Sequence, residues 1–412
     1  MAQDDLPGLL ILPFPPNPLN SAALNAAYRP SIASALTKAR KTTSAAKLVV
    51  AIACPILQGQ FLRSKTLSWP EAQALIAGVY SLISVLCAQL SISTEMDGGP
   101  GSVDATVVLI DHDRGKRYTP DFRPAIEPNN TTIVDMPTFA SAYFPWSAIF
   151  HARSEQGLQV YQTYLRFAEG KQKLRQNQLV YVEGGLTLNI TPAAAVDSGV
   201  IAPAQTKTYP VVCLGGTFDY LHPGHKLLLS AAALLLEVPR KGDAAVKPAR
   251  YIIGITGDEM LRNKKFAEFV QTWEVRARNV ILFLAQLLEL SPRGWKDGAM
   301  PKIDEKDGEF SAAFREGTIE VQCVRIQDAF GPTITVEEIE ALVVSGETRS
   351  GGQAVNDKRA EKGWHALEVF EVDVLDAEEM AEDEPTRTEN FASKISSTVI
   401  RQQRAARMGT KI

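Results

Sequence analysis

The sequence predicts two α/β domains, each built on buried strands that alternate with helices. Short apolar runs bounded by glycine, proline or polar residues recur along the chain, which is typical of strands buried in a sheet. Longer stretches with helical periodicity separate these runs, and 412 residues are enough for two or three domains with sizeable cores. A segment biased toward Pro, Ala, Gly and Thr predicts a linker at 196–208, between a first domain at 1–195 and a second at 209–412.

The first domain is expected to be a separate α/β domain of unassigned type. Predicted strands are Leu9–Pro13, Lys47–Ala53, Val107–Ile110, Gln159–Phe167 and Leu179–Val182, and predicted helices are Ser21–Ala39 and Trp69–Leu90. The polar turn at 111–115 predicts a hairpin after the third of these strands. No chemical motif occurs in this half, so the sequence predicts no role for it.

Composition limits the class of protein. A hydrophobic content of 45% with 22% charged residues is typical of globular proteins, and a net charge of −4 argues against general nucleic-acid or membrane-surface binding. The four cysteines form no metal or redox motif, so buried free thiols in a reducing compartment are expected, with no bound metal. The start of the chain is acidic, unlike a presequence, and the uncharged stretch Ala74–Ser91 has no basic flank. We therefore expect a cytoplasmic protein in which this stretch is a core helix and not a membrane span.

The second domain alternates strands and helices more regularly. Predicted strands are Val211–Leu214, Tyr251–Thr256, Ile319–Ile326, Ala341–Val344 and Leu367–Val374, and predicted helices are Lys226–Leu236, Glu274–Leu290, Gly352–Lys362 and Ser397–Met408. Repeated βα units imply a parallel sheet with right-handed crossovers and a ligand at the carboxyl ends of its strands. The polar insertions Pro239–Pro248 and Ser291–Glu309 are expected to be surface loops.

The strongest sign of a ligand lies where the strand Val211–Leu214 gives way to the next helix. Gly215 and Gly216 let the backbone turn tightly and approach a ligand closely. His222 and His225 are three residues apart at the helix entry, so both can face the same side. There they would stand beside free backbone N–H groups and the positive end of a helix dipole, which predicts a phosphate site. The alternative is an ordinary strand–turn–helix unit with two surface histidines.

The segment Gly215-Gly216-Thr217-Phe218-Asp219…His222-Pro223-Gly224-His225 resembles the glycine turn and HxGH motif of the nucleotidyltransferase superfamily. Over about residues 209–408 the chain is similar to phosphopantetheine adenylyltransferase, in the form seen in archaea and in the adenylyltransferase part of eukaryotic CoA synthase. The resemblance implies a Rossmann-like nucleotidyltransferase domain with a parallel sheet, which transfers AMP from ATP to 4′-phosphopantetheine and so forms dephospho-CoA and pyrophosphate. It implies Mg²⁺ bound with ATP, and other enzymes of coenzyme A biosynthesis as further candidate partners.

Three more stretches carry this resemblance: Gly257–Lys265, Val343–Asn356 and Lys394–Arg401. By resemblance, the catalytic residues are His222, His225 and Lys264; the residues that bind phosphopantetheine are Gly216, Thr217, Phe218, Lys265 and Arg349; and those that bind ATP are Gly215, Ser345, Glu347, Ser396, Ser397, Thr398 and Arg401. The choice between Lys264 and Lys265 stays open. The role of Arg276 also stays open, because the order of Glu and Arg differs here from the family pattern.

The implied reaction needs no general base, because its phosphate nucleophile is already an anion. Catalysis would come from positioning two substrates and neutralising charge. Two alternatives stay open. One is a cytidylyltransferase acting on a phospho-alcohol, although such enzymes favour a closing motif different from Ile395–Thr398. The other is a non-catalytic scaffold of a complex for coenzyme A synthesis.

Overall fold

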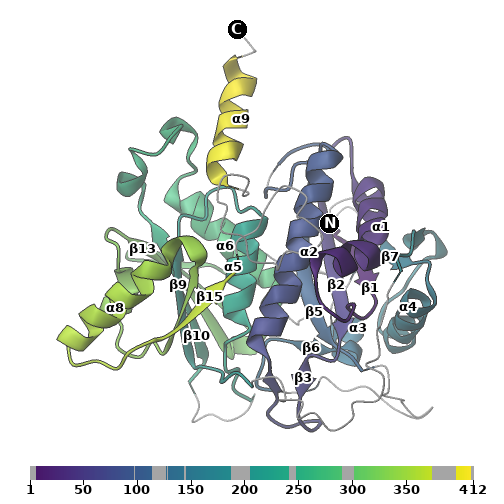
Figure 1. Cartoon of the computed structure of the whole chain (residues 1–412), viewed down its shortest axis with the longest axis horizontal. Coiled ribbons are helices and arrows are strands. Elements are labelled where there is room, and N and C mark those ends of the chain that lie inside the picture. Colours follow the sequence, from purple (N-terminus) through teal and green to yellow (C-terminus); the bar gives the residue numbers. More distant parts are fainter. Residues whose placement is uncertain are drawn as a thin grey trace.

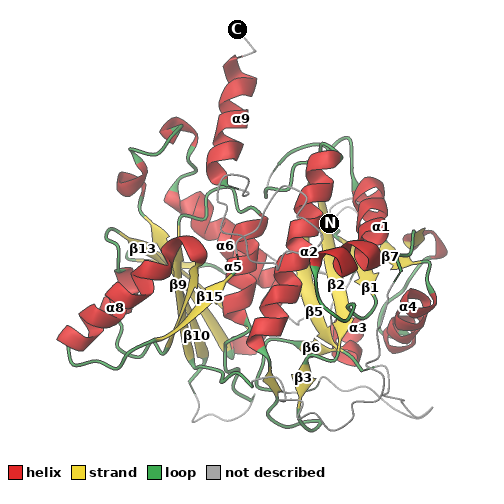
Figure 2. Cartoon of the chain, in the orientation of Figure 1, coloured by secondary structure: helices red, strands yellow, loops and turns green. Residues whose placement is uncertain are grey.

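The computed structural model describes residues 6–96, 98–113, 127, 129–142, 145–186, 205–240, 247–289, 301–373 and 396–409. Two helix-covered sheets stand side by side (Figures 1 and 2). We call residues 6–186 the N-terminal half and residues 205–409 the C-terminal half. The predicted linker lies largely outside the described residues, and the domain boundaries remain predictions.

The N-terminal half contains a six-stranded parallel sheet of order β6-β5-β2-β1-β7-β8. Its strands are β1 (Gly8–Leu12), β2 (Ala46–Cys54), β5 (Val103–Asp111), β6 (Val134–Asp135), β7 (Ile149–Ala152) and β8 (Leu179–Val182), and β3 (Leu57–Gln58) and β4 (Thr66–Leu67) form a small separate ladder. Successive side chains of a strand point to opposite faces. Leu10 and Val50 accordingly pack with α1 (Ser21–Ala39) and α2 (Trp69–Gln89), whereas Leu9 and Val49 pack with α3 (Met136–Ala142) and α4 (Glu155–Ala168).

One prediction for this half is wrong. Residues 159–167 were expected to form a strand but belong to helix α4, where Ser154 caps the first turn by accepting a hydrogen bond from the Gly157 N–H. The buried residues of α4 recur at helical spacing, and include Val160, Tyr161, Tyr164 and Phe167. Their β-forming residue types misled the prediction, because tertiary burial overrides propensity. The return strand of the hairpin expected after β5 would fall within residues 114–126, which lie outside the described residues.

Helix α2 is long and apolar enough to cross a bilayer, with a mean hydropathy of 1.6 over its most apolar window. However, 72% of that window is buried inside the protein. The helix packs against α1 and β5 of its own half and against α5 of the other half, in the middle of the molecule (Figure 1). The prediction of a core helix is therefore confirmed.

The C-terminal half contains a seven-stranded sheet of order β11-β12-β13-β10-β9-β14-β15. Its strands are β9 (Val211–Gly216), β10 (Ala249–Thr256), β11 (Asp304–Lys306), β12 (Glu309–Phe314), β13 (Ile319–Ile326), β14 (Ala341–Ser345) and β15 (Glu368–Val372). All neighbours from β13 to β15 are parallel, as the predicted Rossmann-like fold requires, whereas β11 and β12 pair antiparallel on the edge. The insertion expected to be a surface loop thus contributes part of a β-hairpin, and its residues 291–300 lie outside the described residues.

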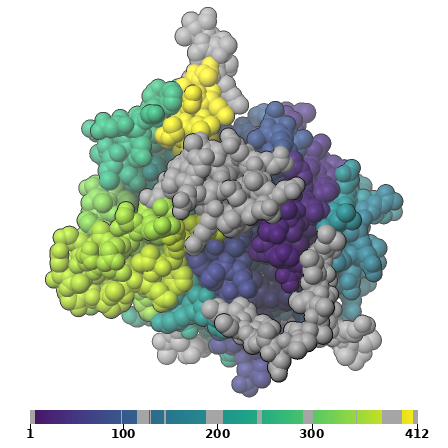
Figure 3. All heavy atoms as spheres, viewed as in Figure 1, coloured from purple at the N-terminus to yellow at the C-terminus, as the bar shows by residue number. Residues whose placement is uncertain are grey.

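The helices of this half lie on both faces of its sheet. Helices α5 (Pro223–Ala233) and α6 (Trp273–Leu288) cover the face toward the N-terminal half, and α8 (Arg349–Glu361) covers the other face. Helix α9 (Ser397–Gly409) projects beyond both sheets (Figure 1). In the space-filling view, α9 is the yellow segment at the top, between the C-terminal and N-terminal halves (Figure 3).

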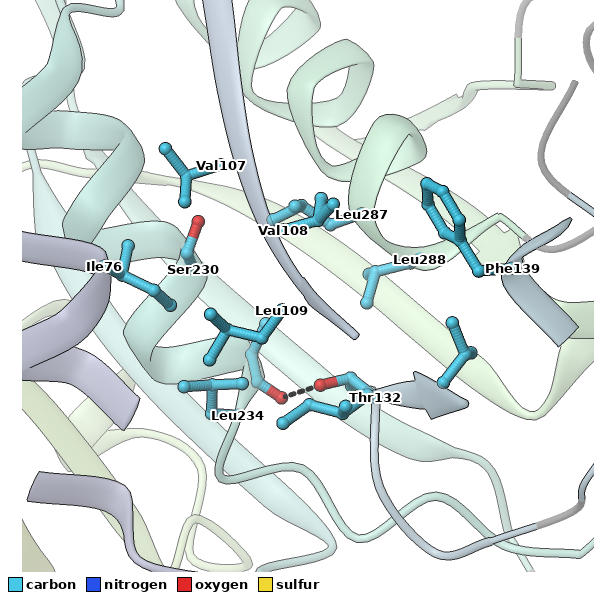
Figure 4. Close-up of a pocket in the computed structure, with 13 residues that line it drawn as sticks. Ile76, Val107, Val108, Leu109, Thr132, Phe139, Ser230, Leu234, Leu287 and Leu288 are labelled. Carbon is cyan, nitrogen blue, oxygen red and sulfur yellow. Dashed lines mark hydrogen bonds between the residues drawn. The ribbon is translucent and has the colours of Figure 1, made fainter. Parts of the chain in front are cut away.

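One apolar core joins the two halves, because residues of α2 and β5 pack in the same cluster as residues of α5 and α6. Hydrogen bonds cross this interface. The Trp69 indole N–H donates to the carbonyl of Ala231 at 2.8 Å, and Thr106 Oγ1 donates to Gln286 Oε1 at 2.7 Å. Near the end of α5, Thr132 Oγ1 donates to the Ala233 carbonyl at 3.1 Å (Figure 4).

A cavity of about 50 Å³ lies within this interface, lined by residues of β5, α5 and α6 (Figure 4). Val107→Ile would add one methylene to the cavity wall. We expect the free energy of unfolding to rise by up to about 0.8 kcal/mol, because the methylene fills empty space. Urea unfolding of the full-length wild type and variant measures this change. A lower midpoint for the variant would show instead that the site is already tightly packed.

Candidate active site

A cleft of about 670 Å³ opens at the carboxyl edge of the C-terminal sheet. This is the edge at which α/β sheets bind ligands. The structure brings together at this cleft the predicted site residues Gly215, Gly216, Thr217, His222, His225, Lys264, Ser345, Ser396, Ser397, Thr398 and Arg401. They come from segments far apart in the sequence, namely the ends of β9 and β14, the segment after β10, and the first turns of α5 and α9.

The turn after β9 has an unusual backbone. Phe218 and Tyr220 have left-handed φ angles of 53° and 50°, which residues with a Cβ rarely adopt. A Cβ on Gly216 would lie 2.9 Å from the Phe218 ring, so this position requires glycine. Phe218 is fully buried and its ring centroid lies 5.3 Å from that of His225. Its ring thus supports His225 and does not face the cleft as a substrate-binding side chain would.

His222 and His225 stack on each other at the start of α5, with ring centroids 3.8 Å apart and an interplanar angle of 23°. Among the described residues, His225 Nδ1 is buried and has no hydrogen-bond partner. Burial, followed by the proximity of His222 and then of Arg276, holds the pKa of His225 well below its ordinary value of 6.5. His225 is therefore neutral at neutral pH, with one ring nitrogen as a donor and the other as an acceptor.

This depressed pKa predicts a pH dependence of stability. As pH falls below 6.5, the unfolded chain binds a proton at His225 that the folded protein does not bind. The folded state therefore loses up to about 1.4 kcal/mol per pH unit, from about pH 6.5 down to the folded-state pKa. We expect the free energy of unfolding to fall more steeply with acidification in the wild type than in His225→Gln. Urea unfolding between about pH 7.5 and pH 5.5 tests this, and parallel curves would contradict it.

Arg276 holds together the backbone segments that form the cleft. The sequence alone left the role of this residue open. Its side chain is fully buried. It donates hydrogen bonds to the carbonyls of Gln271 (2.9 Å), Thr217 (2.7 Å) and Thr256 (2.8 Å), and to Asp258 Oδ1 (2.6 Å). Arg276 thus joins the turn after β9, the end of β10 and the start of α6.

Asp219 is a second organising residue, and the motif Gly-Thr-Phe-Asp contained it without indicating a role. It is fully buried; its Oδ1 accepts from the Gln271 N–H at 3.0 Å and its Oδ2 accepts from Arg401 Nη1 at 2.6 Å. Burial raises the pKa of this carboxyl group, against the lowering effects of these two donors and of Arg276. Asp219 thereby fixes the last helix, α9, to the turn after β9.

The first turn of α9 opens into the cleft. Ser396, Ser397 and Thr398 all line it; Ser397 Oγ donates to the Asp219 carbonyl at 2.9 Å, and Thr398 Oγ1 accepts from Arg401 Nη2 at 3.0 Å. Arg401 is 3% exposed and also donates to the carbonyl of Lys265 at 3.0 Å. Arg401 therefore fixes the geometry of the cleft, whether or not it also contacts a ligand. The preceding Lys394 and Ile395 of the predicted motif lie outside the described residues.

The remaining predicted residues do not all line the cleft. The exposed side chain of Lys264 lines the cleft, whereas Lys265 contributes its carbonyl to Arg401. Ser345 lines the cleft at the end of β14. Arg349, however, makes a bidentate ion pair with Glu371 at 2.6 Å, so a phosphate contact would require this pair to open. The side chain of Glu347 is outside the described part of the chain.

Two carboxylates also line the cleft. Asp328 accepts hydrogen bonds from the Phe330 and Gly331 N–H groups at 2.7 and 2.6 Å, and Asp373 accepts one from Gln73 of the N-terminal half at 3.2 Å. Within the described residues, no cluster of three or more His, Cys, Asp or Glu side chains could hold a metal ion. A divalent cation here would therefore take most of its ligands from a bound polyphosphate and water.

Helix N-termini attract anions, and two of them, those of α5 and α9, open into this one cleft. The donors beside them are neutral imidazole, ammonium and hydroxyl groups, which suit phosphate oxygens. The class of protein that this fold defines is an α/β protein with a Rossmann-like domain of the nucleotidyltransferase type.

Comparison with known proteins makes the class more specific. Residues 1–188 match a domain of unknown function, DUF8446. The chain is 35% identical over 199 residues to the phosphopantetheine adenylyltransferase of Saccharomyces cerevisiae, covering 48% of this chain and 50% of that protein. It is 30% identical over 196 residues to the phosphopantetheine adenylyltransferase of Thermococcus gammatolerans, covering 47% of this chain and 89% of that protein. The chain belongs to the phosphopantetheine adenylyltransferase family.

The match is partial in length. The aligned region spans about half the length of the yeast relative. A solved structure from Archaeoglobus fulgidus, described as a protein with unknown function, is 29% identical, with a TM-score of 0.26, and the match covers 39% of this chain and 88% of that one.

Proposed function

We propose that this protein is a pantetheine-phosphate adenylyltransferase. A phosphate oxygen of 4′-phosphopantetheine attacks the α-phosphorus of ATP, the bond from that phosphorus to the pyrophosphate oxygen breaks, and dephospho-CoA and pyrophosphate form. The observation that carries the proposal is the stacked histidine pair at the start of α5, placed in a cleft that a second helix N-terminus also enters. The family of the chain supports the choice of substrates.

The residues of the cleft suit a reaction whose main demand is charge neutralisation. His222 and His225 would each donate one N–H to phosphate oxygens of ATP, and Lys264 would neutralise the phosphates that meet at the reacting centre. Thr217 would position the phosphate of phosphopantetheine, and the first turn of α9 would hold the outer phosphates of ATP. Mg²⁺, when bound with ATP, would supply further neutralisation of the triphosphate. The protein itself needs no general base.

A direct assay tests the proposal. Full-length protein is incubated with ATP, Mg²⁺ and 4′-phosphopantetheine, and pyrophosphate and dephospho-CoA are measured. Parallel reactions replace ATP by CTP and the acceptor by phosphocholine or glycerol phosphate, which distinguishes a cytidylyltransferase. Pyrophosphate formation that requires ATP and phosphopantetheine supports the proposal. Well-folded protein that releases none with any pair would favour a non-catalytic scaffold of a complex for coenzyme A synthesis, and would overturn it.

Two further expectations belong to this proposal. The cytoplasm is the proposed location, because it supplies ATP and favours the four free cysteines, all of which are buried. Other enzymes of coenzyme A biosynthesis are proposed partners, and co-purification with the tagged full-length chain would test them.

A further inference from the structure

We propose that the N-terminal half positions the active site of the C-terminal half, and that the buried ion pair between Asp104 and Lys226 is its principal contact for this purpose. This inference rests on the proposed function for its kinetic consequence. It assigns a role to the region that matches a domain of unknown function.

Lys226 directly follows His225 in the first turn of α5. Its side chain is only 1% exposed, and Asp104 is 5% exposed. Lys226 Nζ pairs with Asp104 Oδ1 and also donates a hydrogen bond to the carbonyl of Ala105 at 2.8 Å. Both acceptors belong to β5 of the N-terminal half. The helix turn that carries the histidine is therefore attached to the other half of the protein by a desolvated charge pair.

The carbonyl of Ala105 lies on an edge of β5 that the short strand β6 does not cover, because β6 pairs only with Ile110 and Asp111. On the same part of β5, which β6 does not pair, the Val107 N–H donates to Tyr80 Oη of α2 at 3.1 Å. Side chains thus satisfy backbone groups that a neighbouring strand would otherwise pair. The position of α5 is consequently linked to the position of a strand, which is a rigid element.

Two other residues of the N-terminal half contact other walls of the cleft. Gln73 of α2 donates to Asp373, which lines the cleft directly after β15, at 3.2 Å. Glu95, in the segment after α2, lies 3.6 Å from Arg404 of α9, the helix whose first turn lines the cleft. Three parts of the cleft, namely α5, the end of β15 and α9, are thus each held by the N-terminal half. A structural interface with no positioning role would not need to meet the cleft at three separate points.

The test compares two aspartates on one strand in the full-length protein. Asp104→Asn removes the charge that pairs with Lys226 and keeps the shape of the side chain. Asp111→Asn is the matched control, because Asp111 pairs with the buried Lys65 at 3.3 Å within the N-terminal half. Asp111 is seven residues further along β5, which places it about 23 Å from Asp104 along the strand. Turnover, KM for ATP and phosphopantetheine, thermal midpoint, and hydrogen exchange of peptides covering residues 217–230 are measured for both variants.

We expect Asp104→Asn to lower turnover about tenfold while KM for ATP changes by less than about twofold, because a displaced donor costs more in the transition state than in ground-state binding. Exchange in the first turn of α5 should become faster. Asp111→Asn should lower the thermal midpoint and leave turnover and α5 exchange near their wild-type values. Equal turnover and equal α5 exchange in the two variants would overturn the proposal.

A second variant keeps the test decisive if Asp104→Asn does not fold. Gln73→Met removes the contact with Asp373 and introduces no charge. We expect lower turnover with little change in the thermal midpoint, and wild-type turnover would count against the proposal. If the wild type itself transfers no adenylyl group, the proposed function fails. Hydrogen exchange at residues 217–230 then still decides the positioning proposal, since it requires no reaction.

Discussion

Replacing His225 by alanine is expected to lower turnover by about 10²–10³, with a much smaller change in affinity for ATP. A donor aimed at charge that develops in the transition state is worth roughly 2.7–4 kcal/mol, whereas a helix dipole near its end contributes about 0.3–1 kcal/mol. The histidine should therefore contribute more to the rate than the helix terminus on which it stands. Steady-state pyrophosphate release and equilibrium ATP binding measure the two quantities separately.

A control variant must show that loss of a histidine outside the cleft does not lower turnover. His365 lies outside the cleft, where its Nε2 is 2.9 Å from the carbonyl of Ile339. His365→Gln should keep near wild-type turnover. His225→Ala with near-normal turnover in a well-folded protein would remove His225 from the mechanism. A loss confined to ATP affinity would show that it binds the ground state and the transition state equally well.

Replacing Arg276 by methionine is expected to lower the free energy of unfolding by about 3–5 kcal/mol, because the carboxylate and the backbone carbonyls that it satisfies lose their donor. The affected groups are the carbonyls of Gln271, Thr217 and Thr256 and the side chain of Asp258. The pKa of the Arg276 guanidinium is lowered by burial, yet its four acceptors hold it in the charged form. Urea unfolding of the full-length chain measures the change.

Arg278→Met is the matched control, since Arg278 is on the same helix but exposed, with its guanidinium 6.0 Å from the Phe310 ring. Its loss should change stability by less than about 1 kcal/mol. Similar losses in the two variants would show that helix α6, and not the bonds of Arg276, accounts for the effect. A stable Arg276→Met protein with reduced turnover would indicate that Arg276 acts mainly on the positions of Thr217 and the histidines.

Much of the C-terminal fold could be predicted from the sequence because its signals are local. The apolar run of β9, the glycine turn and the helix entry at Pro223 lie within about one strand and one helix turn, so they are visible as a pattern. The residues that hold this turn in place could not be predicted in the same way. Asp219 and Arg401 are 182 positions apart, and Arg276 is 59 positions from Thr217. Only the folded chain brings them together.

The N-terminal half shows a different reason for failure. Most of helix α4 was predicted to be a strand, because the large residues of its buried face are valine, tyrosine and phenylalanine. The burial of Asp104 and Lys226 was also not foreseen, since charged side chains are normally exposed and nothing local indicates their pairing. In both cases the structure depends on the surface against which the residues pack, and residue type alone does not predict that surface. For α2, whose buried residues are mostly apolar, residue type was sufficient.

The shared core of the two halves has a consequence for the unit of folding. The adenylyltransferase motifs lie in one half, and the match to DUF8446 lies in the other, so homology divides the chain in two. The two halves are not expected to be independently stable, because α2, β5, α5 and α6 contribute to one cluster of buried residues. Either half alone would present a large apolar face to water, with a strong tendency to associate. We therefore expect the two halves to melt in one cooperative transition, so that a destabilising substitution in either half lowers the stability of both.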